Sequence, residues 1–369
     1  MKTRAAVLRE TGKWYEIEEL ELDPPKAGEV LVTFMAAGLC HTDDHPRTGD
    51  LPCRLPMVGG HEGAGVVEAV GEGVTRVAVG DHVACSFVPV CGTCRYCSTG
   101  RQNLCNSGLN AQVGCLPDGT FRFHTESGED VGALCVLGSF SQYAVLHETS
   151  CVKIPDDVPF ELAALVSCGV TTGWGSAVYT AGVRPGDTVV VYGVGGVGIN
   201  AVQGARYAGA RHVVAVDPVS LKLEKAQEFG ATHVADDAGK AFELVEELTQ
   251  GLLADHAICT VGVMTAEVVS NAFEIVGKGG QVTVTGMGNY TTAIHGGLLP
   301  AFQKRIVGSL FGGANPLHDI PNLLELYKTG DLKLDELITR RYSLEQVNDG
   351  YRDMLDGRNV RGVLIHDHA

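Results

Sequence analysis

Two cysteine-containing stretches of this sequence have the composition of metal sites. One of them, CGTCRYCSTGRQNLC, spaces its cysteines as C-x2-C-x2-C-x7-C, at Cys91, Cys94, Cys97 and Cys105. Four thiolates from one loop are typical of a closed, structural zinc site. An iron–sulfur cluster is the alternative, because bacterial ferredoxins begin with the same C-x2-C-x2-C run. The last spacing here is seven residues rather than three and no proline follows, so zinc is favoured.

The stretch GLCHTDDH contains three strong metal ligands, Cys40, His41 and His45. They could form one metal site by themselves, or each could have a separate role. Two further candidates have glycine neighbours, His61 in GGHEGAG and Cys168 in SCGVTTG. Cys40, His61 and Cys168 would form a Cys2His set with one open position, which suits a catalytic zinc. A buried cysteine is more often a small hydrophobic residue, so the residues alone leave both interpretations open.

A glycine-rich turn indicates a dinucleotide site. GVGGVG follows the apolar strand TVVVYG and opens a helix, and Asp217 ends the next strand 24 positions after Gly193. Glycines there let the backbone approach a pyrophosphate at the helix N-terminus. Asp217 would accept hydrogen bonds from the adenosine ribose and repel a 2′-phosphate, which predicts NAD rather than NADP. The residues expected at this cofactor are Gly193, Gly195, Gly196, Gly198 and Asp217, with Lys222 facing either the ribose or solvent.

The distribution of strands and helices predicts two domains, since 369 residues exceed what one core usually supports. Short β-branched runs separated by glycine and proline indicate a β-rich region over residues 1–150. From about residue 170, strands alternate with helices, which predicts an α/β fold with a doubly wound parallel sheet. In that part we expect helices over 220–231, capped by Ser220, and over 265–280, with a strand at 281–286.

The overall composition limits the classes of partner. Lys and Arg number 28 against 44 Asp and Glu, a net charge of −16 that argues against nucleic acid. No run of about 18 apolar residues is evident, so no membrane span is expected. The N-terminus becomes charged before a signal-type apolar stretch develops, which favours the cytosol. Twelve cysteines in a reducing compartment indicate metal or redox chemistry rather than disulfides.

Together these motifs resemble the zinc-dependent alcohol dehydrogenases of the medium-chain dehydrogenase/reductase family. The resemblance spans essentially the whole chain, through GLCHTDDH, GGHEGAGVV, the four-cysteine loop, SCGVTTGWGSAV, GVGGVG and the terminal RGVL. It implies a β-rich GroES-like catalytic domain over 1–169 and 312–369, and a Rossmann NAD-binding domain over 170–311. It also implies NAD, one catalytic and one structural zinc per chain, and a homo-dimer or homo-tetramer.

The resemblance assigns the catalytic zinc to Cys40, His61 and Cys168, and a structural zinc to the four-cysteine loop. Glu62 is expected beside the catalytic zinc, and Asp43 is expected to orient the His61 ring. The two histidines of GLCHTDDH are then not ligands.

The same resemblance implies a proton path and two binding surfaces. Thr42 would accept the alcohol's proton and pass it to the nicotinamide ribose, and His45 would deliver it to solvent. Positions that match cofactor contacts are those of His41, Thr172 and Arg361. Leu51 and Phe87 match substrate-pocket positions and favour an apolar alcohol, although core packing explains each of them as well.

The loop after the four cysteines bears on the substrate. The segment 106–138 is long, as in the branch that includes glutathione-dependent formaldehyde dehydrogenases, but Leu109 replaces the arginine those enzymes use. RTGDLP, GWGSAVYTAGVRPGD and SLFGGANPLHDIP most resemble actinobacterial nicotinoprotein alcohol dehydrogenases, whose bound NAD is recycled by an external acceptor such as a nitroso dye. The sequence therefore predicts oxidation of a primary or aromatic alcohol to its aldehyde. The alternatives are a formaldehyde dehydrogenase that uses another thiol, and a non-catalytic NAD-binding protein with structural zinc only.

Overall fold

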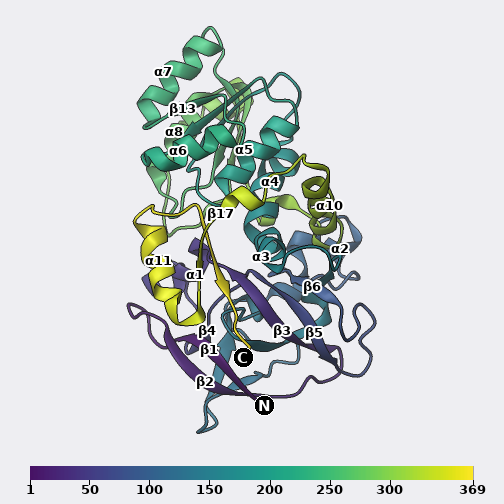
Figure 1. Cartoon of the computed structure of the whole chain (residues 1–369). Coiled ribbons are helices and arrows are strands. Elements are labelled where there is room, and N and C mark those ends of the chain that lie inside the picture. The colour runs from purple at the N-terminus through teal and green to yellow at the C-terminus, as the bar shows by residue number, and fades with distance from the viewer. Residues whose placement is uncertain (369) are drawn as a thin grey trace. The chain divides into compact units, whose positions relative to one another are not determined.

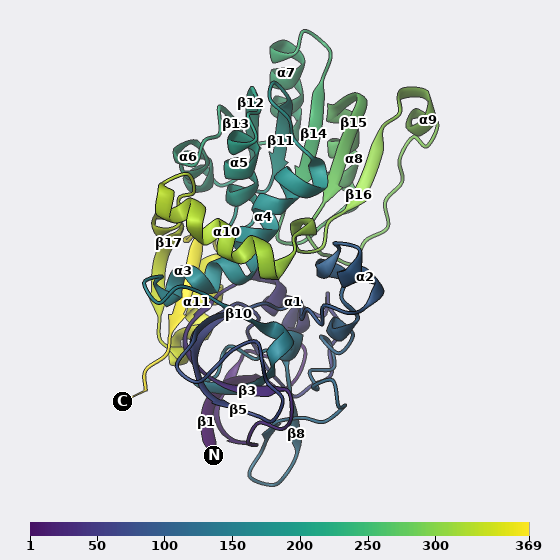
Figure 2. The ribbon, with the colours of Figure 1, turned by 90° about the vertical axis from the view of Figure 1, so that its right-hand side faces the viewer.

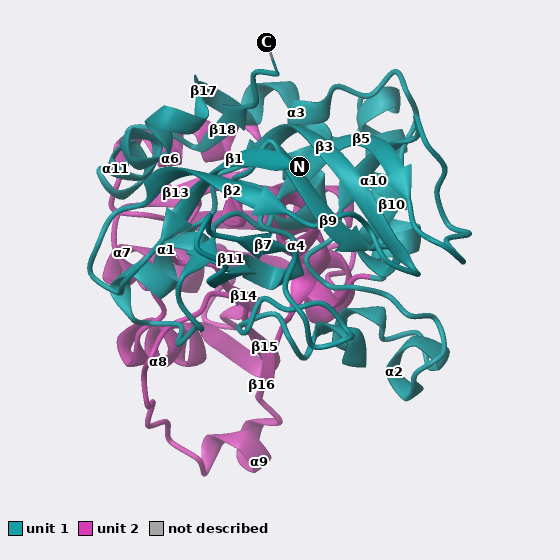
Figure 3. Cartoon of the chain, turned by 90° about the horizontal axis from the view of Figure 1, so that it is seen from below, with its two compact units in different colours: residues 1–168, 315–369 teal, residues 169–314 magenta. Residues whose placement is uncertain are grey.

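The computed structural model describes residues 1–368, and the chain divides into two compact units. Residues 1–168 and 315–369 make up unit 1, and residues 169–314 make up unit 2 (Figure 3). The sequence places the domain boundaries after residues 169 and 311, and that assignment stays a prediction.

Unit 1 is built on a small closed barrel and a larger sheet. The barrel, in its strand order, consists of β1 (Lys2–Leu8), β2 (Glu16–Leu22), β7 (Phe123–His124), β8 (Asp130–Ala133) and β4 (Met57–Val58). The seven-stranded sheet consists of β10 (Cys151–Lys153), β6 (His82–Cys85), β5 (Gly63–Val70), β3 (Glu29–Gly38), β18 (Arg361–Ile365) and β17 (Ile338–Tyr342), with β9 (Tyr143–His147) paired to β3. The C-terminal strand β18 lies antiparallel beside β3 (Figure 1), so residues from both ends of the sequence meet there.

Short helices connect these strands. The α-helices of unit 1 are α1 (His41–Thr48), α2 (Arg95–Ser98), α3 (Phe160–Leu165), α10 (Pro316–Thr329) and α11 (Val347–Leu355). The 3-10 turns are η1 (Gln102–Leu104), η2 (Asn106–Gly108), η3 (Leu134–Val136), η4 (Glu148–Ser150), η8 (Asp335–Leu337) and η9 (Leu344–Gln346). An aromatic cluster of Tyr15, Phe140 and Tyr351 is buried between β1, α1 and α11, with ring centroids of Tyr15 and Tyr351 5.9 Å apart.

Unit 2 is a six-stranded parallel sheet with helical connections. Its strands, in sheet order, are β13 (His233–Ala235), β12 (His212–Val216), β11 (Thr188–Tyr192), β14 (Ala254–Cys259), β15 (Val276–Val284) and β16 (Arg305–Gly308). The helices are α4 (Thr171–Gly175), α5 (Gly198–Tyr207), α6 (Ser220–Glu228), α7 (Ala238–Leu248), α8 (Ala266–Ile275) and α9 (Leu298–Phe302), with the turn η7 (Phe311–Gly313). Figure 2 shows the strands side by side with the helices along them. All five residues of β11 are buried, as a sheet covered on both faces requires, and the predicted parallel α/β sheet is confirmed.

Two local expectations for unit 2 were wrong. The helix expected over 265–280 ends at Ile275, because Val276 is fully buried and pairs with Ala254 as the first residue of β15. Ser220 does not cap α6. It is the first helical residue, and the preceding Val219 N–H donates to Asp217 Oδ1 at 3.0 Å.

One helical stretch, Phe160–Ala181, is long and apolar enough to cross a membrane by length and composition, with a mean hydropathy of 1.2. Within it, η5 (Val166–Val170) and η6 (Ser176–Ala181) are π-helical. No such stretch was expected from the sequence. Its apolar window is 89% buried inside the protein, as in a core helix, and a core helix passes the same test.

A buried ion pair fixes the start of β3. Arg122 and Glu29 are each 3% exposed, and Arg122 Nε donates to Glu29 Oε2 at 2.8 Å. Replacing Arg122 with alanine leaves the Glu29 carboxylate buried without its partner, so we expect a loss of about 3 kcal/mol or more in the free energy of unfolding. Urea denaturation measures it. Lys2→Ala, which breaks an exposed pair with Glu19, is the control and should leave the free energy of unfolding almost unchanged. Equal losses for the two variants would contradict this role.

Candidate functional site

Four buried side chains of unit 1 form a compact donor cluster. Cys40, His61, Glu62 and Cys168 each place one donor atom within 4.8 Å of the others. His61 Nε2 lies 3.3 Å from Cys168 Sγ. All four are at most 9% exposed. Two thiols, an imidazole and a carboxylate in this arrangement fit a zinc ion with three protein ligands and one variable position.

Three separate backbone features bring these donors together. Cys40 is the N-cap residue of α1, just beyond the end of β3. His61 precedes β5 and follows Gly60, whose φ of 89° favours glycine and where a Cβ would lie 2.5 Å from Phe140 and Ser139 side-chain atoms. Cys168 lies in the π-helical turn η5, a conformation that is rare and frequent at functional sites.

Asp43 holds the His61 ring. Its Oδ1 lies 2.7 Å from His61 Nδ1, and both side chains are buried. This contact leaves His61 Nε2 facing the sulfur of Cys168. The backbone oxygen of Asp43 in turn accepts a hydrogen bond of 2.8 Å from the hydroxyl of Tyr15. This is the geometry that the orienting role expected of Asp43 requires.

Glu62 forms a buried ion pair with Arg361, which is 3% exposed. Burial raises the pKa of Glu62 to about 7, although the Arg361 charge opposes that shift. Gly38, at the end of β3, lies against this pair, since a Cβ there would be 2.0 Å from Glu62 Oε2. Arg361, expected from the resemblance at the cofactor, is thus placed beside the donor cluster, and its cofactor contact stays a prediction.

The two thiols of the cluster differ in acidity. A hydrogen bond with Cys168 is the main reason that the pKa of Cys40 lies well below its ordinary value, and His61 adds to this effect. Burial raises the pKa of Cys168 well above its ordinary value. Metal ligation requires the thiolate form. Of the two thiols, Cys40 therefore takes the thiolate form more readily.

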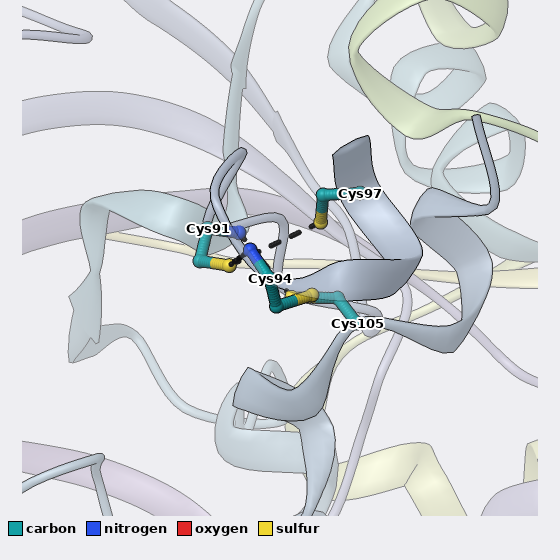
Figure 4. A group of neighbouring side chains, drawn as sticks. All are labelled: Cys91, Cys94, Cys97 and Cys105. Carbon is teal, nitrogen blue, oxygen red and sulfur yellow. Dashed lines mark hydrogen bonds between the residues drawn. The ribbon is translucent and has the colours of Figure 1, made fainter. Parts of the chain in front are cut away.

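The four-cysteine loop forms a second donor cluster, shown in Figure 4. The sulfurs of Cys91 and Cys97 are 4.0 Å apart, and those of Cys94 and Cys105 are 3.9 Å apart. Burial opposes ionisation of Cys91, but hydrogen bonds from backbone N–H groups and nearby side chains lower its pKa to about 6. Four sulfurs within 4.8 Å of one another fit a closed tetrahedral zinc.

The other residues of GLCHTDDH lie on α1. The Cys40 Sγ and Thr42 Oγ1 are 3.8 Å apart. The rings of His41 and His45 are 5.2 Å apart. His45 is only 2% exposed, so its ring does not itself reach solvent. Neither histidine belongs to a donor cluster among the residues described.

The expected substrate-pocket residues lie differently. The ring of Phe87 meets the ring of His61 edge-on, with centroids 5.5 Å apart and an interplanar angle of 88°. Leu51 is 9% exposed and follows α1, with its N–H donating to His45 O at 3.2 Å. Both positions are compatible with a pocket or with core packing.

In unit 2 the glycine turn and Asp217 are adjacent. Gly193 has φ 82°, and a Cβ on Gly198 would lie 1.9 Å from Gly193 O, so both positions require glycine. A Cβ on Gly195 would meet no atom within 4 Å, which is the open approach a pyrophosphate needs. Gly196 is partly exposed beside it. This turn therefore fits a dinucleotide.

Asp217 is 5% exposed and already has partners. Its Oδ2 accepts from Val194 N at 3.0 Å and lies 3.9 Å from Lys222 Nζ. Thr172 is 9% exposed on α4, where Ser176 Oγ donates to its carbonyl at 2.7 Å. Their expected cofactor contacts stay predictions.

Sequence reasoning missed several residues around the donor cluster. Tyr15 supports Asp43, and the hydroxyl of Tyr351 lies 3.4 Å from Cys40 O. Cys135 and Val136 have φ values of 53° and 57°, and burial raises the pKa of Cys135 to about 12. Only the apolar spacing of these residues is visible in the sequence, and it indicates a core.

Comparison with known proteins agrees with this geometry. The family model for the alcohol dehydrogenase GroES-like domain matches residues 26–156, and that for zinc-binding dehydrogenases matches residues 196–329. An NDMA-dependent alcohol dehydrogenase of Amycolatopsis methanolica is 58% identical, over 99% of each chain. Among solved structures, an alcohol dehydrogenase zinc-binding domain protein from Burkholderia ambifaria has a TM-score of 0.92 at 34% identity, covering 100% of both chains. Benzyl alcohol dehydrogenase from Acinetobacter calcoaceticus has a TM-score of 0.91 at 31% identity, with the same coverage.

The fold, the donor clusters and these matches define a zinc-binding dehydrogenase with a GroES-like domain and a Rossmann domain. The chain belongs to the zinc-dependent alcohol dehydrogenase family, and it is an oxidoreductase that acts on alcohols. The fold class and the family expected from the sequence are thereby confirmed.

The Asp43–His61 contact predicts a specific loss of metal affinity. Asp43→Asn weakens the contact that orients the His61 ring. We therefore expect zinc to bind the cluster of Cys40, His61 and Cys168 roughly 10- to 100-fold more weakly. Competition with a fluorescent chelator measures it. Asp44→Asn is the matched control, because buried Asp44 pairs with Arg47 at 2.5 Å instead. Equal zinc affinities in the wild type and Asp43→Asn would refute the orienting role.

Proposed function

We propose that this enzyme oxidises primary or aromatic alcohols to aldehydes with NAD that stays bound and is re-oxidised by an external electron acceptor. The single observation that carries the alcohol oxidation is the buried cluster of Cys40, His61 and Cys168. Support for the bound NAD comes from the 58% identical relative whose name is NDMA-dependent alcohol dehydrogenase. Likeness to a benzyl alcohol dehydrogenase supports an aromatic substrate.

The metal complement in this proposal is two zinc ions per chain. Cys40, His61 and Cys168 hold the catalytic ion, with Glu62 as an additional, exchangeable ligand, and the four-cysteine loop holds the structural ion. When bound, zinc supplies a Lewis acid that lowers the pKa of the alcohol, and NAD supplies the hydride acceptor. Asp43 keeps the His61 ring in place throughout, because its contact uses the nitrogen that does not face the cluster.

Residues beside the cluster orient the substrate and move the proton. Phe87, whose ring packs edge-on against His61, and Leu51 provide apolar surface for the alcohol. Thr42, next to Cys40, accepts the hydroxyl proton, and His45 on the same helix carries it outward. Moving the proton away keeps the reaction from reversing at the cluster.

The cofactor in this proposal binds at the glycine turn of unit 2. Gly193, Gly195, Gly196 and Gly198 form the turn that holds its pyrophosphate, with open space at Gly195, and Asp217 accepts from the adenosine ribose. His41, Thr172, Lys222 and Arg361 complete the proposed contacts. The dimer or tetramer and the cytosolic location expected from the sequence stay predictions.

A non-catalytic NAD-binding protein would have no use for a buried cluster of this kind. The cluster would cost stability if it held no metal, because it buries Glu62, Arg361 and two thiols together. A formaldehyde dehydrogenase that uses another thiol has no specific support in the structure, where Leu109 is 81% exposed.

The proposal predicts what the purified protein contains. After desalting, native mass spectrometry should find two zinc ions and one NAD per chain. Cys97→Ser should retain only one zinc, because three thiolates no longer close the tetrahedral site. Benzyl alcohol should raise the absorbance of reduced nicotinamide, and a nitroso dye should reverse the change. If no nucleotide co-purifies and free NAD supports full turnover, the NAD is exchangeable and that part of the proposal is wrong.

The proton path predicts a pH-dependent defect. His45→Gln removes the only imidazole proposed to carry the proton outward, and we expect alcohol oxidation to slow by roughly 10- to 100-fold at acidic pH, with less effect at alkaline pH. At high pH hydroxide can take the proton instead. Added buffer base should partly restore the rate. An unchanged pH profile would show that His45 has no part in the path.

A further inference from the structure

The position of His45 raises a problem for a path that ends on its ring. His45 is 2% exposed, and its Nδ1 is buried without a hydrogen-bond partner. A ring with so little contact with water cannot release protons rapidly by itself. A further group has to stand between His45 and solvent.

The chain that follows α1 supplies such a group. Gly49, with φ 86°, reverses the chain at the helix end, and its N–H donates to His45 O at 2.9 Å. The next residue is Asp50, whose Oδ2 lies 3.6 Å from His45 Nδ1. The Asp50 side chain is 27% exposed, whereas that of His45 is 2% exposed. This carboxylate therefore faces the buried ring on one side and water on the other.

We propose that Asp50 is the outer end of the proton path and takes the proton from His45 Nδ1. This inference rests on the proposed function. A proton that reaches the His45 ring leaves through Nδ1 to Asp50 Oδ2 and then to water. No electrons change hands, and one proton is released for each alcohol oxidised. The gap of 3.6 Å is slightly longer than a hydrogen bond, and a rotation of the Asp50 side chain would close it.

The surroundings keep Asp50 ionised, so a proton that it accepts passes on readily to water. The Thr48 hydroxyl, 2.6 Å from Oδ2, is the main reason that the pKa of Asp50 lies below its ordinary value. Positive charge on His45 and on His41 acts in the same direction. Thr11 and Gly12 lie against the C-terminal end of α1. The Gly12 N–H donates to Arg47 O, and a Cβ on Gly49 would contact the Thr11 side chain. Neither residue carries a charge.

The decisive experiment measures proton release and hydride transfer separately. Enzyme carrying NAD is mixed with benzyl alcohol in weak buffer, and a pH-indicator dye and nicotinamide absorbance are followed together. In Asp50→Asn we expect proton release to slow about 3- to 10-fold below neutral pH and to recover when imidazole is added. Asp50→Glu should keep the wild-type rate. Glu10→Gln removes an exposed carboxylate just before Thr11 and Gly12, and it should behave as wild type.

The outcomes separate this inference from the proposed function. If the wild type shows no alcohol-dependent nicotinamide signal, the proposed function fails. If the wild type reacts and Asp50→Asn matches it in rate, pH profile and buffer dependence, the role of Asp50 is overturned. A slow Asp50→Glu variant would also overturn it, because the carboxylate is retained.

A second measurement needs neither cofactor nor substrate. The carboxyl carbon of Asp50 can be followed by NMR during an acid titration of the wild type and His45→Gln. Loss of the His45 charge should raise the pKa of Asp50 toward its ordinary value. An identical titration curve would mean that the two side chains are not coupled, which contradicts the proposed transfer.

Discussion

The donor cluster of Cys40, His61, Glu62 and Cys168 depends on the absence of a side chain at Gly38. A Cβ there would lie 2.0 Å from Glu62 Oε2 and 2.9 Å from Arg361 Nη2, so only glycine lets the buried ion pair rest against β3. The Gly38 N–H also donates to Glu62 O at 3.0 Å. Cys40 follows two residues later, and His61 precedes Glu62 in the chain. The close contact at Gly38 thus sets the distances between β3, the segment that contains Glu62 and the strand that begins at Arg361.

Much of the fold follows from local patterns. The buried run of β11 and the glycine turn after it are visible in the sequence because each reflects a requirement of a few neighbouring residues. The end of α8 was misplaced because Val276 gains more by pairing with Ala254 in the sheet than by continuing the helix. The cap of α6 was misplaced because Asp217, outside the expected helix, engages the backbone at its start. The first error arises where a tertiary contact outweighs local propensity, and the second where a local hydrogen bond from the residue two positions after Asp217 takes the place of the expected cap.

The site was predictable in its donors but not in its geometry. The four-cysteine spacing identifies its own cluster, because all four ligands come from one loop. Cys40, His61 and Cys168 are far apart in sequence, so the residues alone left their grouping as one of two interpretations, and the resemblance favoured it. Arg361 meets Glu62 because β18 pairs with β3, a contact across 299 positions for which no local signal exists. The burial of His45 was equally invisible, since a polar residue on a short helix carries no local signal of being buried.

Asp217, which we propose to bind the adenosine ribose, is also part of the framework of unit 2. One of its oxygens accepts from Val194 N in the glycine turn, and the other accepts from Val219 N at the start of α6. The carboxylate is therefore immobilised when the chain folds, so the proposed ribose contact would cost it no further rotational freedom. Because of these two hydrogen bonds, replacing Asp217 to admit a 2′-phosphate would also leave two backbone N–H groups without their acceptor. Evolution toward the phosphorylated cofactor in this chain would accordingly have to rebuild the turn and not merely reverse a charge.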